Sequence, residues 1–423
     1  MHHKAGDNPF LRTTVDAFDT FMFTPKETTH GKGVHIRDGM DLKRTMIMVV
    51  LPLTLLYLFG AWNIGHHHYL VAGMAEEATL LQKFLYGLLQ IIPTFIVVHA
   101  VGLGIEFLFA AKKGHSVEEG FLVSGALIPL IMPPGTPLWM TAIAVAFAVI
   151  FAKEAFGGTG MNIWNVALMA RVFVFFAYPA AISGDVTPVL DDTGKLQSKN
   201  YVWIENDHNL LHNAFGNFFK VNEYDAAYAD MILSPDAISG ATPLAVAATG
   251  LEIDGKEYVG WEAVQQMWTT KELLFGIIPG SVGEMFKPLI LLGAIFLVLM
   301  GVGSWRIMVS FAVGAAIAGI IMNVMPGASD FMKVPFQYQF LMGSLLFALA
   351  FMATDPVTAA QTNMGKLWYG FLIGFVGMIV RVINPAYPEG WMLAILFMNT
   401  FAPLIDHMVL SRNIKRRMAH ATN

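Results

Sequence analysis

The stretch that decides the fold reads Leu127-Ile128-Pro129-Leu130-Ile131-Met132-Pro133-Pro134-Gly135-Thr136-Pro137. It is an apolar run that ends at two consecutive prolines, which cannot continue a helix. A comparable run occurs later, where Ala348-Leu349-Ala350-Phe351-Met352-Ala353-Thr354-Asp355-Pro356-Val357-Thr358 ends in a break with Thr and Pro. An interrupted helix at membrane depth has to be buried in protein or line a cavity. The two stretches therefore predict a membrane protein built around broken helices.

The overall composition is that of a protein with many membrane spans. Of the 423 residues, 55% are apolar and 13% are charged, and the mean hydropathy is +0.56. A soluble domain carries about 25% charged residues, so a soluble enzyme and a disordered chain are both excluded. The net charge of −5 excludes the basic footprint of a nucleic-acid-binding protein. The chain has no cysteine, so any redox chemistry needs an organic cofactor, a quinone or a haem rather than a cysteine-ligated iron–sulfur cluster.

Apolar runs predict ten spans, although those beside the first break are shorter than the roughly 20 residues of a straight span. The expected spans are Thr45–Trp62, Leu85–Ala111, Phe121–Met132, Trp139–Phe151, Ile163–Ile182, Phe286–Val302, Ile307–Val324, Phe336–Ala353, Leu367–Val382 and Met392–Leu410. Five spans per half require an inverted repeat, and matching breaks in inverted halves point to a site near the midplane. Simple kinking at Pro is the alternative. The sequence thus predicts an all-α polytopic membrane protein with ten transmembrane helices in two inverted five-helix repeats.

The distribution of Lys and Arg predicts the orientation, because these residues are enriched in cytoplasmic loops. Most of them fall on one side of the expected spans, namely Lys4, Arg12, Lys26, Lys32, Arg37, Lys43, Arg44, Lys112, Lys113, Lys153, Arg306, Lys366, Arg412, Lys415, Arg416 and Arg417. Both termini are therefore expected in the cytoplasm. The expected parts are an amino-terminal segment 1–44, a first repeat 45–182, an outer loop 183–271, a second repeat 272–410 and a basic tail 411–423.

The outer loop contains the segment Asp236-Ala237-Ile238-Ser239-Gly240-Ala241-Thr242-Pro243. Ser239-Gly240 is a turn dipeptide, and the small residues Gly240 and Ala241 leave an open approach to the Thr242 hydroxyl. Pro243 restricts the backbone directly after it. An exposed hydroxyl flanked by small residues is a good acceptor for a transferred phosphoryl group, and an ordinary polar loop is the alternative explanation.

Asp236, Ser239, Gly240, Ala241 and Thr242 occupy the fixed positions of Asp-x-x-Ser-Gly-Ala-Thr, the pattern at which a flavin transferase attaches FMN to the final Thr. From about residue 30 to 417, the chain resembles the NqrB/RnfD family. NqrB is a membrane component of the Na⁺-translocating NADH:quinone reductases, and RnfD is its counterpart in Rnf complexes. The resemblance also rests on His35–Asp38, Asp41–Val49, Lys153–Gly160, Phe175–Pro179, Ser304–Arg306, Met352–Pro356 and Asn384–Arg417.

This resemblance implies a redox component of a multi-subunit complex in a bacterial inner membrane. FMN would be joined to Thr242 by a phosphoester on the periplasmic side, and Asp236, Ser239, Gly240 and Ala241 would be recognised by the flavin transferase during maturation. A non-covalent riboflavin would lie deeper in the chain, and ubiquinone would be reduced near the cytoplasmic face. Electrons would come from NADH through partner subunits that carry another FMN and the iron–sulfur centres, and the redox steps would drive Na⁺ outward.

The loop before the fifth expected span is the candidate riboflavin or midplane site. Glycines there permit close backbone approach, and amide side chains can meet the carbonyls and ring nitrogens of a flavin. The candidate residues are Gly157, Gly158, Thr159, Asn162 and Asn165, and tight helix packing is the alternative explanation. The loop departs from the family pattern, in which Arg is usual at the position of Met161 and Pro at that of Val166.

Charged side chains within the expected spans are functional candidates, because burying a charge in lipid is unfavourable. Arg171 is one, and Glu106, Asp355 and Asp406 form a candidate cation pathway, with no metal expected beyond transient Na⁺. Each acid also has a structural explanation. Glu106 can pair with the nearby Lys112-Lys113, Asp355 can cap a helix, and Asp406 can lie at the interface.

Two further segments receive structural interpretations. His66-His67-His68 is expected in a short outer loop, solvated and not spaced as a metal site. Asp7–Thr24 is expected to be an interfacial anchoring helix, and a border of the quinone pocket is the alternative for it.

Three functions compete on the sequence. The NqrB component of a Na⁺-pumping NADH:quinone reductase is favoured by the long segment before the first span and by the closing run Arg412–Arg417. The RnfD component of an Rnf-type ferredoxin:NAD⁺ oxidoreductase shares the flavin pattern but does not reduce quinone. A passive channel or solute transporter fits the broken helices equally well, but it has no use for a covalent flavin.

The second expected span generates a prediction about quinone binding. The resemblance implies a quinone pocket at a position where the family has a Gly-Gly pair and this chain has Gly102-Leu103. Leu122 of the third span is assigned to the same pocket. Because Leu103 is larger than Gly, it narrows the pocket. We expect Leu103→Gly to shift the curve for quinone-site inhibitors, measured on the NADH:quinone activity of the complex. An unchanged inhibition curve would refute this assignment.

Overall fold

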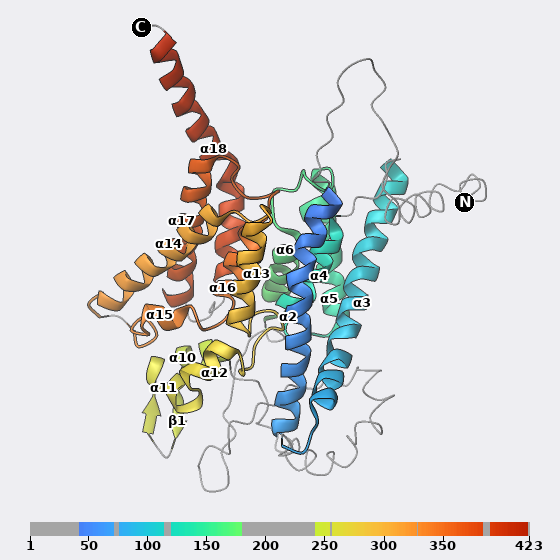
Figure 1. Ribbon diagram of the computed structural model, residues 1–423, viewed down its shortest axis with the longest axis vertical. Coiled ribbons are helices and arrows are strands. Elements are labelled where there is room, and N and C mark those ends of the chain that lie inside the picture. Colours follow the sequence, from blue (N-terminus) through green and yellow to red (C-terminus); the bar gives the residue numbers. More distant parts are fainter. Residues whose placement is uncertain are drawn as a thin grey trace, which may run out of the picture.

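The computed structural model describes residues 42–71, 76–113, 120–179, 242–253, 256–327, 329–383 and 390–421. They form a helical bundle with a small cap at one end, and the carboxyl-terminal part of the last helix projects from the opposite end (Figure 1). We call these two ends the cap end and the tail end.

The first half of the bundle consists of helices that alternate in direction between the two ends. They are α2 (Leu42–Val71), α3 (Leu80–Lys113), α4 (Phe121–Ile131), α5 (Leu138–Phe147) and α6 (Val166–Ala177). A π-helical turn, η2 (Ala148–Lys153), and a 3₁₀ turn, η3 (Glu154–Phe156), extend α5.

The second half follows the cap. It contains a helical stretch that begins at residue 336 and is broken at two places. Its elements are α13 (Lys287–Leu299), α14 (Trp305–Val324), α15 (Phe336–Gln339), α16 (Leu345–Phe347), the π-helical turn η4 (Ala348–Met352), α17 (Asn363–Ile383) and α18 (Trp391–Ala421). A turn over residues 340–344 separates α15 from α16, and a second break follows η4.

The cap lies between the halves in the sequence and has its own apolar core. It contains α10 (Pro243–Thr249), the strands β1 (Leu251–Ile253) and β2 (Lys256–Tyr258), α11 (Gly260–Met267) and α12 (Thr270–Phe275). The strands are antiparallel, with Leu251 opposite Tyr258. Leu244, Trp268 and Phe331 belong to the cap core, which holds α10 at the cap end.

The structure confirms an all-α polytopic membrane protein. Six helices among the described residues are long and apolar enough to span a membrane, and they lie within Arg44–Leu70, Leu80–Lys113, Leu138–Phe156, Trp305–Val324, Asn363–Ile383 and Trp391–His420. Three shorter apolar helices, Phe121–Ile131, Val166–Ala177 and Lys287–Leu299, coincide with three further expected spans. The remaining expected span, Phe336–Ala353, is not one continuous helix. The count of ten spans and the inverted repeat stay predictions.

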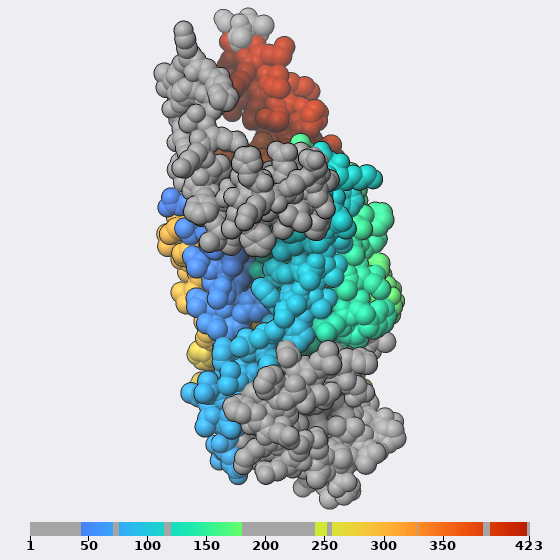
Figure 2. Space-filling view, turned by 90° about the vertical axis from the view of Figure 1, so that its right-hand side faces the viewer, coloured from blue at the N-terminus to red at the C-terminus, as the bar shows by residue number. Residues whose placement is uncertain are grey.

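Close contacts between helices hold the bundle together across both halves. α2 packs on α3 and on α13, and α6 packs on α18. A single apolar core includes Leu53 and Phe121 from the first half and Phe311 and Tyr369 from the second. Figure 2 shows α3 (light blue to cyan) beside α2 (blue), and the carboxyl-terminal part of α18 (red) at the top of the view.

The first helix is longer than the sequence predicted, and the expectation for the three histidines is wrong. α2 continues to Val71, so His66, His67 and His68 are helical, and the side chains of His67 and His68 are only 0% and 5% exposed. The ring of His68 stacks on Tyr86 of α3 with centroids 3.8 Å apart. The two helices can approach this closely because Gly65 has no Cβ, which would overlap the backbone of α3. Packing on α3 thus keeps these polar residues in the helix.

Candidate functional site

Thr242 is the first described residue of the cap and the N-cap of α10. Its Oγ1 accepts a hydrogen bond from the backbone N–H of Ala245 at 3.2 Å, and Pro243 occupies the first helical position, where its lack of an N–H is harmless. The side chain is half-buried. The hydroxyl is therefore held in one place by a packed helix. Asp236, Ser239, Gly240 and Ala241 lie outside the described residues.

Thr242 lies at the opposite end of the bundle from part of the basic residues, whereas Lys256 and Lys271 lie in the cap itself (Figure 1). α10 is at the cap end, whereas the start of α2 with Arg44, the end of α3 with Lys112-Lys113 and the basic part of α18 are at the tail end (Figure 1). This arrangement agrees with the orientation derived from the loop charges. The basic residues Arg412–Arg417 continue α18 rather than forming a separate tail.

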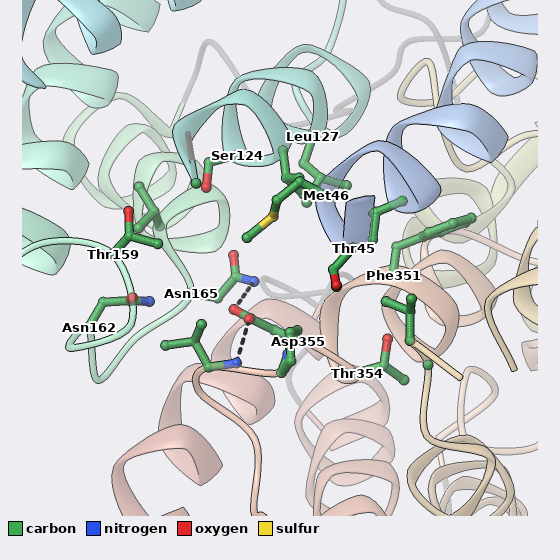
Figure 3. Close-up of a pocket in the computed structure, with 18 of the residues that line it drawn as sticks. Thr45, Met46, Ser124, Leu127, Thr159, Asn162, Asn165, Phe351, Thr354 and Asp355 are labelled. Carbon is green, nitrogen blue, oxygen red and sulfur yellow. Dashed lines mark hydrogen bonds between the residues drawn. The ribbon is translucent and has the colours of Figure 1, made fainter. Parts of the chain in front are cut away.

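A pocket lies between the two halves, beside the first turns of α2 and α4, which begin at the tail end (Figure 1), and part of its lining is drawn in Figure 3. The first half contributes the first turns of α2 and α4, and the second half contributes the break that follows η4. The lining residues are Thr45, Met46, Val49, Gly120, Val123, Ser124, Leu127, Lys153, Thr159, Asn162, Asn165, Val166, Leu297, Val302, Gly303, Phe351, Thr354, Asp355, Pro356 and Val357. The pocket therefore combines the candidate riboflavin loop with Asp355 of the candidate cation pathway.

Asp355 sits in this pocket and accepts hydrogen bonds from both halves of the bundle. Its Oδ1 accepts from the N–H of Val357 at 3.0 Å. Its Oδ2 accepts from Thr358 Oγ1 at 3.1 Å and from Asn165 Nδ2 at 3.1 Å, and two of these bonds are drawn in Figure 3. The carboxylate thus stabilises the break that follows η4 and joins it to the first half.

Asn165 makes two hydrogen bonds that connect the halves. Its Oδ1 accepts from the N–H of Leu168 and caps α6 at 3.1 Å, while its Nδ2 donates to Asp355. Asn162 donates to the carbonyl of Trp164 at 3.2 Å. Of the candidate riboflavin residues, Thr159, Asn162 and Asn165 line the pocket, whereas Gly157 and Gly158 form the turn behind it with positive φ angles.

Glu106 pairs with Lys153, and not with Lys112-Lys113. Both side chains of this ion pair are 4% exposed, and Lys113 instead binds Glu154 at 3.0 Å. Lys153, which the sequence placed in a cytoplasmic loop, is buried in η2 and lines the pocket. That expectation is wrong because Lys153 has a buried partner 47 residues earlier in the chain.

Asp406 does not line the pocket. Its carboxylate accepts hydrogen bonds from the residues that connect the break after η4 to α17. Its Oδ2 accepts from the N–H of Gln361 at 2.7 Å, and its Oδ1 accepts from the N–H and hydroxyl of Thr362 at 2.9 and 2.5 Å. Because α17 begins at Asn363, this carboxylate also lies near the positive end of a helix dipole.

The candidate quinone residues lie on α3 (Gly102 and Leu103) and on α4 (Leu122). Gly102 lies against the ring of Phe121, where a Cβ would overlap it, and the side chains of Leu103 and Leu122 are half-buried. None of the three lines the pocket described above.

Several pocket residues were not singled out from the sequence. Thr45, Met46 and Ser124 reach the pocket from the first turns of α2 and α4, and Phe351 reaches it from η4. Thr45 and Met46 belong to a segment that carries the family resemblance, and Phe351 belongs to the second broken stretch, but neither pattern indicates which side chains line a cavity.

Comparisons with known proteins agree over nearly the whole chain. Residues 29–415 match the family described as NQR2, RnfD, RnfE. The chain is 37% identical to the B-subunit of the Na(+)-translocating NADH-quinone reductase of Chromohalobacter salexigens, over 98% of this chain and 93% of that protein. It is 37% identical to the protein of the same name from Pseudoalteromonas atlantica, over 96% and 93%. With that of Neisseria meningitidis serogroup A the identity is 36%, over 96% and 93%.

The link between Asn165 and Asp355 generates a prediction about stability. Asn165→Ser keeps a good N-cap for α6 but removes the amide that donates to Asp355. A hydrogen bond to a charged group contributes about 1.5–3 kcal/mol, so we expect a loss of that size, measured by thermal unfolding in detergent. Asn162→Ser is the matched control, because it loses only the bond to the neighbouring Trp164 carbonyl. Equal unfolding temperatures for Asn165→Ser and the unchanged protein would contradict the prediction.

Proposed function

The chain belongs to the NQR2, RnfD, RnfE family, and from this membership we propose that it is the NqrB component of a Na⁺-translocating NADH:ubiquinone reductase. In this proposal it works within a multi-subunit complex, receives electrons that originate from NADH, passes them to ubiquinone and couples this transfer to Na⁺ export. The observation that carries the proposal is the 36–37% identity, over nearly the full length, to relatives named as the B-subunit of that quinone reductase. These names favour NqrB over RnfD.

We further propose that Thr242 carries FMN through a phosphoester. The environment of the hydroxyl fits this modification. Oγ1 serves as the acceptor for the N–H of Ala245, so its hydrogen can be replaced by phosphorus while the oxygen still caps α10. The packed cap then fixes the point of attachment. When bound, the flavin supplies one- and two-electron redox chemistry, and the chain supplies the anchor.

The pocket between the halves is the proposed riboflavin site. Leu127, Met46 and Phe351 provide apolar walls for an isoalloxazine ring, while Thr159 and Asn162 provide polar groups at one edge. Asn165 already caps α6 and binds Asp355, so its proposed role is to hold the pocket together. Gly102 and Leu103 of α3 and Leu122 of α4 remain the proposed place of ubiquinone.

Orientation and partners complete the proposal. We place the chain in the bacterial inner membrane with both termini in the cytoplasm and Thr242 on the periplasmic side, as the positions of Arg44 and of the basic end of α18 opposite the cap support. The partners are a second FMN-carrying subunit, iron–sulfur subunits and, during maturation, a flavin transferase that reaches the cap from outside.

The covalent flavin can be tested on a denaturing gel under ultraviolet light. When the chain is expressed with its transferase, we expect a fluorescent band that disappears in Thr242→Asn, because Asn lacks a hydroxyl. Asn is also a good N-cap, so α10 is preserved and the loss cannot be ascribed to unfolding. Thr242→Ser is the matched control that keeps both cap and hydroxyl. A fluorescent Thr242→Asn band would reject the attachment site, and a dark wild-type band despite an active transferase would reject the redox function.

The proposed Na⁺ route runs from the pocket past Asp355. Asp355 begins the loop to α17, and Asp406 binds the end of this loop through the N–H groups of residues 361 and 362. Carboxylates and the carbonyls of an interrupted helix supply the hard oxygen ligands that Na⁺ requires. We expect Asp355→Asn to abolish most NADH-driven Na⁺ uptake into sealed vesicles, and Asp406→Asn to reduce it by loosening residues 361–362. Undiminished uptake in a variant carrying both changes would eliminate this route.

A further inference from the structure

The loop that leads into α6 is attached to α18 by the buried amide of Asn399, whose side chain is 1% exposed. Its Oδ1 accepts from the backbone N–H of Asn165 at 3.2 Å. Its Nδ2 donates to the carbonyl of Ile395 at 3.2 Å and to the hydroxyl oxygen of Tyr369, a fully buried residue of α17. In the reverse orientation, the amide oxygen would face the Ile395 carbonyl and the amide nitrogen would face the N–H of Asn165, so the hydrogen bonds fix the orientation. Tyr369 and Asn399 thus join α17 and α18 to the start of α6.

Asn165 extends this connection to Asp355, as Figure 3 shows. Its Nδ2 donates to Asp355 Oδ2 at 3.1 Å, and both residues line the pocket. The donors of Val357 and Thr358 to the same carboxylate lie within the break itself, so Asn165 is the donor that relates the carboxylate to the first half. A series of hydrogen bonds, which we call the polar line, therefore runs from Tyr369 through Asn399 and Asn165 to Asp355.

α18 holds the chain on both sides of this carboxylate. Asn399 binds the loop of the first half, and Asp406 binds the N–H groups of residues 361 and 362, which follow the break. Asn399 and Asp406 are seven positions apart in one continuous helix, which corresponds to about two turns and places them on the same face. A single helix therefore supports both chain segments that place Asp355 at the pocket.

We propose that Asn399 and Tyr369 are positioning residues that fix the Asp355 carboxylate at the pocket and thereby strengthen its binding of Na⁺. Neither side chain lines the pocket, so both act through Asn165. Without Asn399, the loop before α6 loses its attachment at Asn165, and the Asn165 amide holds the carboxylate less firmly. Ordering the carboxylate then opposes ion binding. The inference rests on the proposed function, because Na⁺ is the ion assigned to the route past Asp355.

The experiment measures the NADH:quinone activity of the purified whole complex as a function of Na⁺ concentration. Asn399→Leu removes the amide and keeps a similar volume. We expect the half-saturating Na⁺ concentration to rise about five- to tenfold, because the Asn165 amide stays but is no longer held in place. The rate at saturating Na⁺ is expected to stay within about twofold, since binding is weakened and not the later steps. Tyr369→Phe is expected to give a smaller shift in the same direction, because the Ile395 carbonyl still binds the Asn399 amide.

Thr400→Val is the matched control. Thr400 Oγ1 accepts from Trp164 Nε1 at 2.9 Å and donates to the carbonyl of Leu396 at 3.2 Å. Like Asn399, it ties the loop before α6 to α18 and binds the carbonyl four residues earlier, but it is not part of the polar line. We expect an unchanged half-saturating Na⁺ concentration. A shift equal to that of Asn399→Leu would reveal a general loosening of the loop and overturn the proposal.

A double variant tests whether Asn399 acts through Asn165. Asn165→Ser removes the amide that reaches Asp355, so adding Asn399→Leu to it is expected to cause little further shift. Additive shifts would contradict the polar line, and so would an unchanged half-saturating Na⁺ concentration in Asn399→Leu and Tyr369→Phe. Tyr369→Phe decides alone if Asn399→Leu does not assemble. Wild-type activity that does not respond to Na⁺ would instead reject the proposed function.

Discussion

The structure depends on satisfying the backbone groups that its broken helices leave open. A carbonyl without a partner at membrane depth is strongly unfavourable, and α4 ends within the buried core at Ile131. The carbonyl of Leu130 accepts from the N–H of Gly283 at 2.8 Å, and that of Ile131 accepts from Arg171. Arg381 donates to carbonyls at the turn between α15 and α16 in the same way. Buried cations thus complete helices that would otherwise be incompatible with a membrane.

The same constraint explains how the halves are joined. The end of α4 is completed by the loop that precedes α13, the first helix of the second half. The break after η4 lies in the pocket beside the first turn of α2, the first helix of the first half, and is tied by Asp355 to Asn165. Each break therefore contacts the opposite half. The inverted repeat stays a prediction.

The sequence predicted the helices well and their buried polar contacts poorly, for one physical reason. Apolar runs and consecutive prolines are local properties, so the spans and the break at Met132–Pro137 could be predicted from neighbouring residues. A charge inside or beside a span is also visible, but its partner is not. Lys153 was assigned to a loop because Glu106 is distant in the sequence, and His66–His68 were assigned to a loop because their packing on α3 leaves no local pattern. Lys287 lies at the start of an expected span, and its carbonyl partner at residue 343 is 56 positions away.

These contacts also bear on the proposed function, in which one bundle conducts electrons and holds back ions. Thr242 lies at the cap end and the pocket lies beside the first turns of α2 and α4, which begin at the tail end (Figure 1), so the apolar core of the bundle would separate redox groups at these two places. Electron transfer requires proximity and no open path, whereas Na⁺ needs a continuous series of oxygen ligands. The carbonyls of residues 284 and 343 already accept hydrogen bonds from the Lys287 ammonium, so they are not open ligands for an ion. In the proposed function, Na⁺ would then need a rearrangement of the halves around the breaks to reach open oxygen ligands.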